Sequence, residues 1–169
     1  MTTAIVTGGS SGIGRAAAKA LAKAGYAILI NYSTNEEGAL ATKKEIIEAG
    51  GVAEIYRADV SDAQSCSEMV AFSERTLGTT EVLVANAGKS LVKLMTDTTE
   101  DEWNALFKVN VNGVYNVARA VARGMVDRKR GRIITVSSVW GEVGASCESC
   151  YSATKAAVIG FTKALAKEL

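Results

Sequence analysis

Short runs of β-branched and apolar residues alternate with longer segments of helical periodicity along the whole sequence. The short runs predict strands, and the longer segments, in which Ala, Leu or Val recur at helical spacing, predict helices. Because a dozen or more residues separate successive strands, the strands should lie parallel with helices on both faces, as a doubly wound α/β sheet. The expected strands are 4–7, 27–31, 53–58, 82–85 and 132–137, and the expected helices are 12–24, 36–49, 62–77, 99–127 and 149–169.

The composition narrows the classes of function. The chain has 169 residues with no His, and its 19 basic and 18 acidic side chains give a formal net charge of +1. This charge provides no overall field for binding nucleic acid or an anionic membrane. The lack of His excludes Ser-His-Asp and Cys-His catalysis and His-ligated zinc. We therefore expect a single domain over residues 1–169, with no metal site and with catalytic groups of other types.

The amino terminus enters the first predicted strand at once, without the basic and apolar regions of an export signal. No apolar stretch is long enough to span a bilayer, so these features predict a cytoplasmic protein. The three cysteines, Cys66, Cys147 and Cys150, are not needed to stabilise a domain of this size. Cys147 and Cys150 have the C-x-x-C spacing, but without a second pair or a His that spacing alone does not indicate a redox or metal site.

A glycine-rich turn, TGGSSGIG from Thr7 to Gly14, follows the first predicted strand and opens the first helix. A tight connection is one interpretation, but in this position glycines also let backbone N–H groups approach a pyrophosphate. The turn fits the broad dinucleotide fingerprint of a Rossmann-type domain, and no Walker lysine follows it, which favours a dinucleotide over a nucleoside triphosphate. The candidate cofactor-binding residues here are Gly8, Ser10, Ser11, Gly12, Ile13 and Gly14.

The ends of the next three strands supply further cofactor candidates, because ligands of such sheets bind at the carboxyl ends of the strands. After the second strand there is no carboxylate to bind a ribose 2′-hydroxyl, so NADP is favoured over NAD, although no Arg stands there either. After the third strand, Asp59 could accept a hydrogen bond from the adenine amino group, or it could cap the next helix. The candidates at these ends are Asn31, Tyr32, Ser33, Asp59, Val60, Asn86, Ala87 and Gly88.

A third group of polar residues lies near the carboxyl end of the chain. Ser137 and Ser138 end the fifth strand, and Tyr151 and Lys155 share one face of the last helix at i and i+4. An ammonium group beside a phenol stabilises the phenolate, so Tyr151 could act as an acid or base near neutral pH. Such a pair is usually a surface accident, but the dinucleotide turn upstream favours a catalytic pair.

Taken together, the motifs resemble the short-chain dehydrogenase/reductase family, and within it the 3-oxoacyl-acyl-carrier-protein reductases. The matching elements, in the order of the family, are Thr7-Gly-x-x-x-Gly12-x-Gly14, Asn86-Ala87-Gly88, Asn110, Ser138 and Tyr151-x-x-x-Lys155. The resemblance implies NADPH-dependent reduction of 3-oxoacyl thioesters, in which Tyr151 donates a proton, Ser138 orients the carbonyl oxygen and Lys155 binds the nicotinamide ribose. It also places both Tyr151 and Lys155 among the cofactor-binding residues. It also implies that Asn110 positions a water molecule; the alternative is a mid-helix polar residue that is satisfied locally.

Two further features bear on partners. Four cations after the long helix could dock an acidic acyl carrier protein, or they could simply complement the helix dipole. An apolar stripe on the same helix is typical of a core-facing surface, whereas the resemblance implies a homo-tetramer interface there. The cations are Arg128, Lys129, Arg130 and Arg132, and the stripe is Trp103, Leu106, Phe107, Val114 and Val117.

The resemblance also implies elements beyond residue 169, because family members continue into a sixth strand, a Pro-Gly loop over the nicotinamide and a substrate lid. We therefore expect an incomplete cofactor clamp and an open sheet edge beside the last helix. Two alternative functions stay open. The first is an NAD(P)-dependent alcohol or sugar dehydrogenase with the same site, and the second is a non-catalytic dinucleotide-binding fragment.

Overall fold

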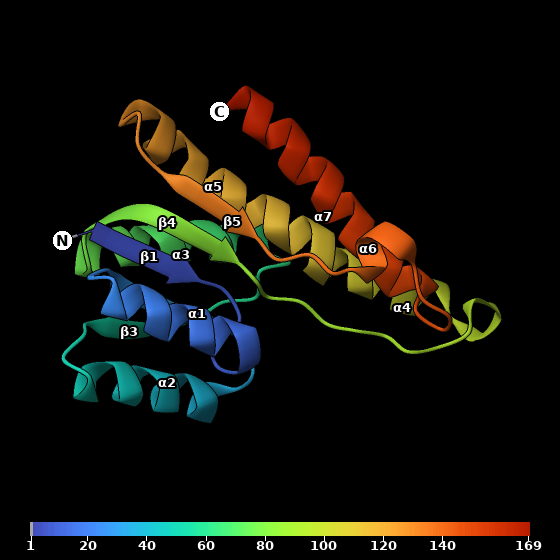
Figure 1. Ribbon diagram of the computed structural model, residues 1–169, viewed down its shortest axis with the longest axis horizontal. Helices are drawn as coiled ribbons and strands as arrows, with labels where there is room; N and C mark the ends of the chain where they lie inside the picture. Colours follow the sequence, from blue (N-terminus) through green and yellow to red (C-terminus); the bar gives the residue numbers. More distant parts are fainter. Residues whose placement is uncertain (1) are drawn as a thin grey trace.

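A parallel sheet in the order β3-β2-β1-β4-β5 forms the middle of the computed structural model, which describes residues 2–169 (Figure 1). Each pair of neighbouring strands is parallel. The chain first places β2 and β3 on one side of β1 and then returns to place β4 on the other side. The topological switch point therefore lies between β1 and β4. The strands are β1 (Thr2–Val6), β2 (Ala27–Tyr32), β3 (Ala53–Arg57), β4 (Thr79–Ala85) and β5 (Arg132–Thr135).

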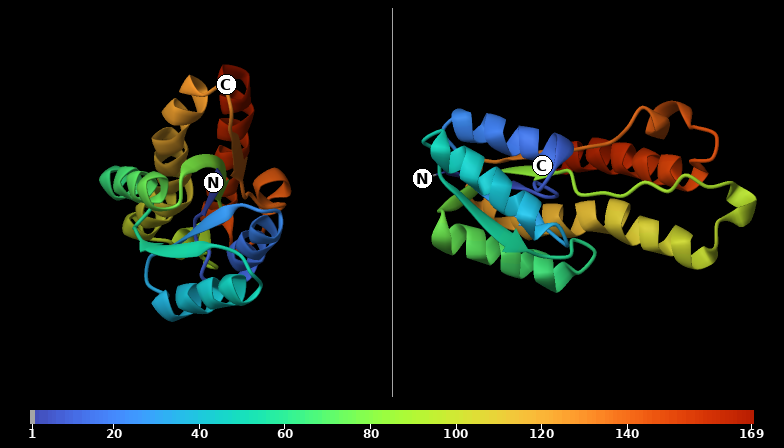
Figure 2. Two further views of the ribbon diagram at one scale, coloured as in Figure 1. Left: turned by 90° about the vertical axis from the view of Figure 1, so that its left-hand side faces the viewer. Right: turned by 90° about the horizontal axis from the view of Figure 1, so that it is seen from below.

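Helices cover both faces of the sheet, as the alternating pattern predicts. One face carries α1 (Gly12–Lys23) and α2 (Glu36–Glu48), and the other carries α3 (Ala63–Thr76) and α5 (Gly113–Asp127). The long helix α7 (Ser149–Glu168) lies beside α5, where the rings of Tyr115 and Phe161 meet edge to face at 6.3 Å (Figures 1 and 2). The shorter helices are α4 (Glu100–Phe107) and α6 (Trp140–Val143).

The two apolar cores are separated by the sheet, and β1, β2 and β4 contribute buried side chains to both. In β1, Ala4 and Val6 pack into the core beneath α1 and α2, whereas Ile5 packs into the core beneath α3 and α5. All three side chains are fully buried. Because successive side chains of a strand point to opposite faces, a strand covered on both sides must be apolar throughout, which explains the continuous apolar runs.

The prediction of one helix over residues 99–127 is wrong. The segment contains α4, a π-helical turn over Lys108–Asn112 (η2) and then α5. Thr99 begins α4 with a capping box, in which its hydroxyl accepts from the Glu102 N–H and the Glu102 carboxylate accepts from the Thr99 N–H. Apolar spacing continues through the π-turn, so periodicity alone could not reveal the interruption. Two short elements were also not predicted, the 3₁₀ turn Met95–Asp97 (η1) and α6.

β5 forms an edge of the sheet, as expected from the sequence. Within residues 2–169 it pairs only with β4, and Ile134 is 41% exposed. A groove of about 820 Å³ lies beside it, lined by the carboxyl-terminal parts of α5 and α7, including Met125 and Leu165. This face of the sheet therefore presents both an unpaired strand edge and apolar side chains.

Most of the predicted apolar stripe belongs to the core of this chain. Leu106, Val114 and Val117 are buried. Trp103 remains 38% exposed and stacks on Phe107 at 4.9 Å between ring centroids. Among residues 2–169, no helix combines the length and the apolar character that crossing a membrane requires.

Candidate active site

The glycine-rich turn between β1 and α1 is shaped by three glycines with different constraints. Gly8 and Gly12 have φ angles of +64° and +52°, in the left-handed region that favours glycine. At Gly14 the limit is space, because a Cβ atom would overlap the Gly8 carbonyl oxygen and lie 2.6 Å from Asn86 Nδ2. The turn therefore keeps its backbone open, and α1 begins without a side-chain cap on its first N–H groups. Uncapped N–H groups at a helix start are suited to an anion.

Hydrogen bonds fasten this turn to the loop after β4. Thr7 Oγ1 accepts from the N–H groups of Asn86 and Ala87, both at 3.0 Å. The Asn86 side chain donates in return to the carbonyl oxygens of Thr7, at 2.9 Å, and Gly8, at 3.3 Å. The side chain of Asn86 is thus used within the chain, and its contribution to the predicted cofactor site is to join the two loops at the switch point.

A cavity of about 400 Å³ lies at the carboxyl ends of β1 to β4. It contains almost the whole predicted cofactor set, with the exception of Gly14, Tyr151 and Lys155, and it adds residues that the sequence did not single out. The predicted residues that line it are Gly8, Ser10, Ser11, Gly12, Ile13, Asn31, Tyr32, Ser33, Asp59, Val60, Asn86, Ala87 and Gly88. The additional residues are Thr34, Asn35, Ala58, Lys89 and Val109.

Two predicted residues make side-chain hydrogen bonds within the protein. Asn31 is buried, and its side chain accepts from the Gly8 N–H at 3.3 Å and donates to the Ala58 carbonyl at 3.0 Å. The side chain of Asp59 accepts from the Ser61 N–H at 2.9 Å in a local turn. The alternative that Asp59 caps the following helix is wrong, because Asp62 is the N-cap of α3. Asn31 therefore shapes the cavity through its backbone and its internal hydrogen bonds.

An arginine that the sequence did not suggest reaches the end of β2 from the neighbouring strand. Arg57 ends β3, where it is the register partner of Tyr32, and its Nε donates to the Ser33 carbonyl at 3.2 Å. The end of β2 alone contains no Arg, but parallel pairing supplies one across the sheet. Only the strand register reveals this neighbour, since Arg57 and Ser33 lie 24 residues apart.

Lys155 is buried close to two other predicted residues. It is 5% exposed, and its Nζ donates to the Val136 carbonyl at 2.9 Å. A Cβ atom built on Gly88 would lie 3.6 Å from this Nζ and 3.2 Å from Asn110 Oδ1, so the three residues converge at one point. Burial lowers the pKa of Lys155 because it disfavours the charged ammonium. Lys155 Nζ lies 5.6 Å from the ring centroid of Tyr151, which is half-buried on the same helix.

Asn110 lies in the π-helical turn and is fully buried. Its Oδ1 accepts from the Lys89 N–H at 2.8 Å, while its Nδ2 donates to the Lys89 carbonyl at 2.8 Å and to Thr154 Oγ1 at 3.0 Å. The alternative of a locally satisfied mid-helix residue is therefore wrong, because all three bonds are long-range. A single amide thus joins η2, the loop after Gly88 and the residue before Lys155, and π-turns are frequent at functional sites.

The two serines after β5 are distinguished by their contacts. Ser137 Oγ donates to the Lys155 carbonyl at 2.8 Å, which ties the strand end to α7. Ser138 Oγ accepts from the Trp140 N–H at 3.2 Å at the start of α6. Gly141 lets α6 approach α7 closely, since a Cβ there would lie 2.7 Å from the Lys155 carbonyl carbon. Ser137 is therefore a structural contact, whereas Ser138 makes a local hydrogen bond at the start of α6, the helix that packs against α7.

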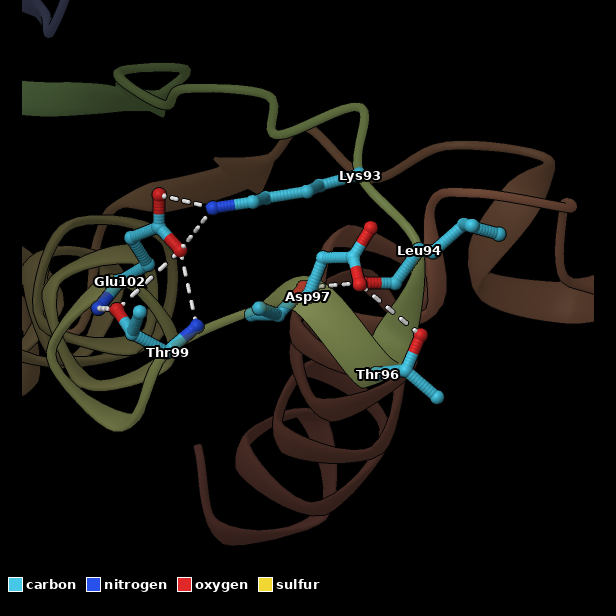
Figure 3. Close-up of polar contacts among 7 residues, drawn as sticks. Lys93, Leu94, Thr96, Asp97, Thr99 and Glu102 are labelled. Atoms are coloured by element: carbon cyan, nitrogen blue, oxygen red, sulfur yellow. Dashed lines mark hydrogen bonds and ion pairs between the residues drawn. The ribbon is translucent and has the colours of Figure 1, made fainter.

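Lys93 anchors the loop after β4 to the first turn of α4, where Figure 3 shows it beside Glu102. The Lys93 Nζ contacts both carboxylate oxygens of Glu102 at 2.9 Å, and the Lys93 N–H donates to the Cys147 carbonyl at 2.6 Å. Hydrogen bonding from the Thr99 N–H, together with Lys93, lowers the pKa of the Glu102 carboxyl. One residue thus connects the loop to α4 and to the turn that precedes Tyr151.

The predicted cationic cluster lies at the opposite end of the sheet from these residues. Figure 1 shows the turn from α5 to β5 at the far end from α6. Arg128 pairs with Glu74 at 3.5 Å, and Arg130 pairs with Glu81 at 3.0 Å. Lys129 has a positive φ of 53°, and Arg132 begins β5 with an exposed side chain. Two of the four cations are therefore engaged within the chain.

Comparison with known proteins agrees with this geometry. The short chain dehydrogenase family matches residues 2–169. The chain is 43% identical to an acetoacetyl-CoA reductase of Shinella zoogloeoides, with 98% of this chain and 66% of the relative covered. It is 40% identical to a 3-oxoacyl-[acyl-carrier-protein] reductase of Synechocystis sp., with 98% and 67% covered. The chain spans about two thirds of the length of these curated relatives.

Solved structures give the same result. A metagenomic short-chain oxidoreductase in complex with NADP superimposes with a TM-score of 0.94 at 33% identity, covering 99% of this chain and 76% of that one. A dehydrogenase/reductase from Sinorhizobium meliloti superimposes with a TM-score of 0.93 at 38% identity, covering 99% and 66%. Fold, switch-point cavity and family match agree over residues 2–169, and the chain therefore belongs to the short-chain dehydrogenase family.

Proposed function

We propose that this chain carries the active site of an NADP-dependent carbonyl reductase that converts 3-oxoacyl thioesters to 3-hydroxyacyl thioesters. The observation that carries the proposal is the convergence of Gly88, Asn110 and Lys155 beside the switch-point cavity, with Tyr151 one turn before Lys155 on α7. The reductases named among the relatives support this class of substrate. The chain spans about two thirds of the length of those relatives, so the activity of the whole protein is part of this proposal.

The residues of the cavity fit a dinucleotide. Gly8 and Gly14 keep side chains out of the turn, and the first N–H groups of α1 have no capping side chain, so an anionic pyrophosphate can approach them. The exposed Ser33 and the guanidinium of Arg57 lie where β2 and β3 end, and no carboxylate follows β2 directly. This arrangement supports NADP over NAD, and one superimposed relative is a complex with NADP.

When bound, the nicotinamide cofactor supplies the hydride that reduces a carbonyl carbon. In the proposed reaction the Tyr151 hydroxyl donates a proton to the carbonyl oxygen, and the Ser138 hydroxyl orients that oxygen and stabilises its developing negative charge. Lys155, held by the Val136 carbonyl, provides a cation that stabilises the Tyr151 phenolate left after proton transfer. Asn110 links the loop at Lys89 to the side-chain hydroxyl of Thr154 on α7.

The experiment is to measure NADPH oxidation by the purified chain with acetoacetyl-CoA, together with fluorescence titration of NADPH and NADH. Tyr151→Phe should abolish turnover while NADPH affinity changes little, because the substitution removes the proton donor and little binding surface. Tyr115→Phe, on the exposed face of α5, is the matched control and should keep full activity. Turnover that survives in Tyr151→Phe would overturn the proposed role of that tyrosine.

The remaining outcomes separate the alternatives. NADPH binding without turnover on any thioester, alcohol or sugar would favour a dinucleotide-binding fragment, and turnover confined to alcohols or sugars would favour a dehydrogenase of the same family.

Three expectations about partners and location stay predictions: docking of an acyl carrier protein at the cationic cluster, assembly into a homo-tetramer and a cytoplasmic location. A carrier protein bound at that cluster would sit at the far end of the sheet from Tyr151, so charge reversal at Lys129 or Arg132 should leave turnover of coenzyme A thioesters unchanged.

A further inference from the structure

Two cysteines flank the start of α7, immediately before Tyr151. Cys150 is the second residue of α7 and is 2% exposed, whereas Cys147 lies in the preceding turn and is partly exposed. The third cysteine, Cys66, lies in α3 in the core beneath that helix, where its Sγ donates to the Val60 carbonyl at 3.4 Å. All three thiols are free in this structure. Cys147 and Cys150 are therefore a local pair, and Cys66 provides an internal control.

The backbone at Cys147 is unusual for a residue with a side chain. Its φ is +60°, in the left-handed region where glycine is the favoured residue. The turn is nevertheless held in place, because the Glu148 N–H donates to the Ala145 carbonyl at 3.2 Å and the Cys147 carbonyl accepts from the Lys93 N–H at 2.6 Å. The turn thus holds a non-glycine residue in a sparsely populated conformation directly before the helix that carries Tyr151.

Neither thiol has another role in the structure. The Sγ of Cys150 makes one weak contact, 4.0 Å from the Trp103 carbonyl oxygen, and Cys147 Sγ lies 3.8 Å from Ser146 Oγ. Burial raises the pKa of the Cys150 thiol, so this cysteine stays protonated and unreactive until a partner forms beside it. Among residues 2–169 there is no group of three or more His, Cys, Asp or Glu side chains that could hold a metal ion.

The spacing of the pair suits a disulfide that acts on the local backbone. Cys147 has a left-handed φ of +60° and lies just outside α7, with two residues between it and Cys150. A disulfide needs its Cβ atoms about 3.5–4.5 Å apart, so forming the bond imposes that spacing on the turn and on the first turn of the helix. This constraint acts on Tyr151, the next residue after Cys150, and on the turn that Lys93 anchors through the Cys147 carbonyl.

We propose that Cys147 and Cys150 form a reversible disulfide under a peroxide oxidant and that this bond switches off the site at Tyr151. The Cys147 sulfur attacks the peroxide, whose O–O bond breaks, and one water leaves as the sulfur becomes a sulfenic acid. The Cys150 thiol then attacks that sulfur, the S–S bond forms, the S–O bond breaks and a second water leaves. Two thiols are oxidised to one disulfide, and one hydrogen peroxide is reduced to two waters.

Formation of the disulfide can be tested without any enzymatic activity. Trypsin should release residues 133–155 as one peptide, because no Lys or Arg lies between Arg132 and Lys155, and this peptide contains both cysteines of the pair. After hydrogen peroxide treatment and alkylation of free thiols, the peptide should lack two hydrogen atoms and carry no alkyl group. Dithiothreitol should restore two alkylatable thiols. Cys66, on the separate peptide 58–75, should stay alkylatable throughout.

Cysteine variants distinguish disulfide formation from simple oxidation of one thiol. Cys147→Ser should protect Cys150 from oxidation, and Cys150→Ala should let Cys147 proceed to the sulfinic acid, whereas Cys66→Ser should form the same disulfide as the original chain. A native chain that goes to sulfinic acid at Cys147, or that keeps both thiols in peroxide, would overturn the disulfide. Because Cys147→Ser changes a partly exposed side chain, it tests the idea without the risk to folding that Cys150→Ala carries.

The effect on turnover rests on the proposed function, whereas the disulfide does not. If the reductase assay succeeds, oxidation should lower turnover by at least about tenfold, a loss of transition-state stabilisation that dithiothreitol should reverse. Cys147→Ser should start at full activity and keep it through mild oxidation. A disulfide that forms in high yield and leaves turnover unchanged would overturn the switch. An inactive chain that still forms the disulfide would count against the proposed function alone.

Discussion

The side-chain amide of Asn110 donates to Thr154 Oγ1 at 3.0 Å across 44 residues of sequence. Thr154 Oγ1 donates onward to the Tyr151 carbonyl at 2.7 Å, so the buried amide in the π-turn is connected to the first turns of α7 by two consecutive hydrogen bonds. The same amide holds both backbone groups of Lys89. The position of the site tyrosine therefore depends on a residue of η2 that does not touch it.

Replacing Asn110 with alanine should destabilise the fold by about 2–4 kcal/mol, because buried groups of Lys89 and Thr154 would lose their partners. Asn110→Asp should also destabilise, since a carboxylate can accept from the Lys89 N–H but cannot donate to the Lys89 carbonyl. Urea unfolding measures both variants against Asn104→Ala, a control at an exposed position of α4. A loss no larger than that of the control would show that the network contributes little.

The burial of Lys155 predicts a pH dependence of stability. The pKa of Lys155 is lower in the folded chain than its ordinary value of about 10.4. At pH values between the two, the unfolded chain binds more protons than the folded chain. Stability linked to this group therefore rises with pH through that range. Relative to Lys155→Met, the native chain should gain unfolding free energy as the pH rises toward about 10. Urea unfolding at several pH values checks this, and a difference that stays constant or falls would contradict it.

The glycines of the site and of α7 predict opposite effects of one added methyl group. Gly14→Ala would place Cβ against the Gly8 carbonyl oxygen and 2.6 Å from Asn86 Nδ2, so it should destabilise by about 1–3 kcal/mol and weaken NADPH binding. Gly160→Ala, in an exposed part of α7 with nothing within 4 Å of the new Cβ, should stabilise by about 0.5–1 kcal/mol. Thermal unfolding of the two variants measures both changes in stability. Equal changes in the unfolding temperature would refute the steric explanation for Gly14.

The end of β2 should decide between the two dinucleotides. Ser33→Asp adds a carboxylate where the 2′-phosphate is proposed to lie, and charge repulsion should lower the NADPH/NADH affinity ratio by about tenfold or more. Ser33→Asn has similar size without the charge and is the matched control. Fluorescence titration with both cofactors provides the ratio, and an equal shift in the two variants would assign the preference to shape instead of charge.

Glu102 predicts a second pH effect with the opposite sign. Its pKa is lowered by the Thr99 N–H and by Lys93, so the ionised carboxylate stabilises the folded state. This contribution is present above the ordinary value near about 4.3 and is lost as the pH falls through the lowered value. Glu102→Gln should therefore be less stable than the native chain at neutral pH, and the difference should shrink in acid. Unfolding curves that differ by the same amount at pH 7 and in acid would contradict the prediction.

The fold could be read from the sequence because local and global signals agree. The apolar run at β2 predicts a strand with boundaries close to those observed, and Asp62, at the start of the predicted helix 62–77, is the N-cap of α3. The break in the predicted helix 99–127 could not be read, because Lys108–Asn112 keeps the apolar spacing of a continuous helix and differs only in its hydrogen-bond pattern.

The site residues that lie within one turn could be predicted from the sequence. The contacts that form only when strands pair in the sheet could not. The turn from Gly8 to Gly14 needs glycines for local reasons of backbone shape and close approach, so the sequence displays it directly. Arg57 reaches Ser33 through the parallel register of β2 and β3, and no short-range signal contains that register. The internal use of the Asn31 side chain was also hidden, because its partners Gly8 and Ala58 lie on two other segments.

The hydroxyl of Thr7 has a consequence for how a dinucleotide would bind. It accepts from both Asn86 and Ala87, so the two loops that form the floor of the cavity are joined by bonds internal to the chain. The conformational entropy of these loops is therefore already lost in folding, and association should cost little further ordering at this floor. The amide hydrogens of Asn86 and Ala87 should accordingly exchange with solvent only through openings as rare as global unfolding, with or without a bound nucleotide.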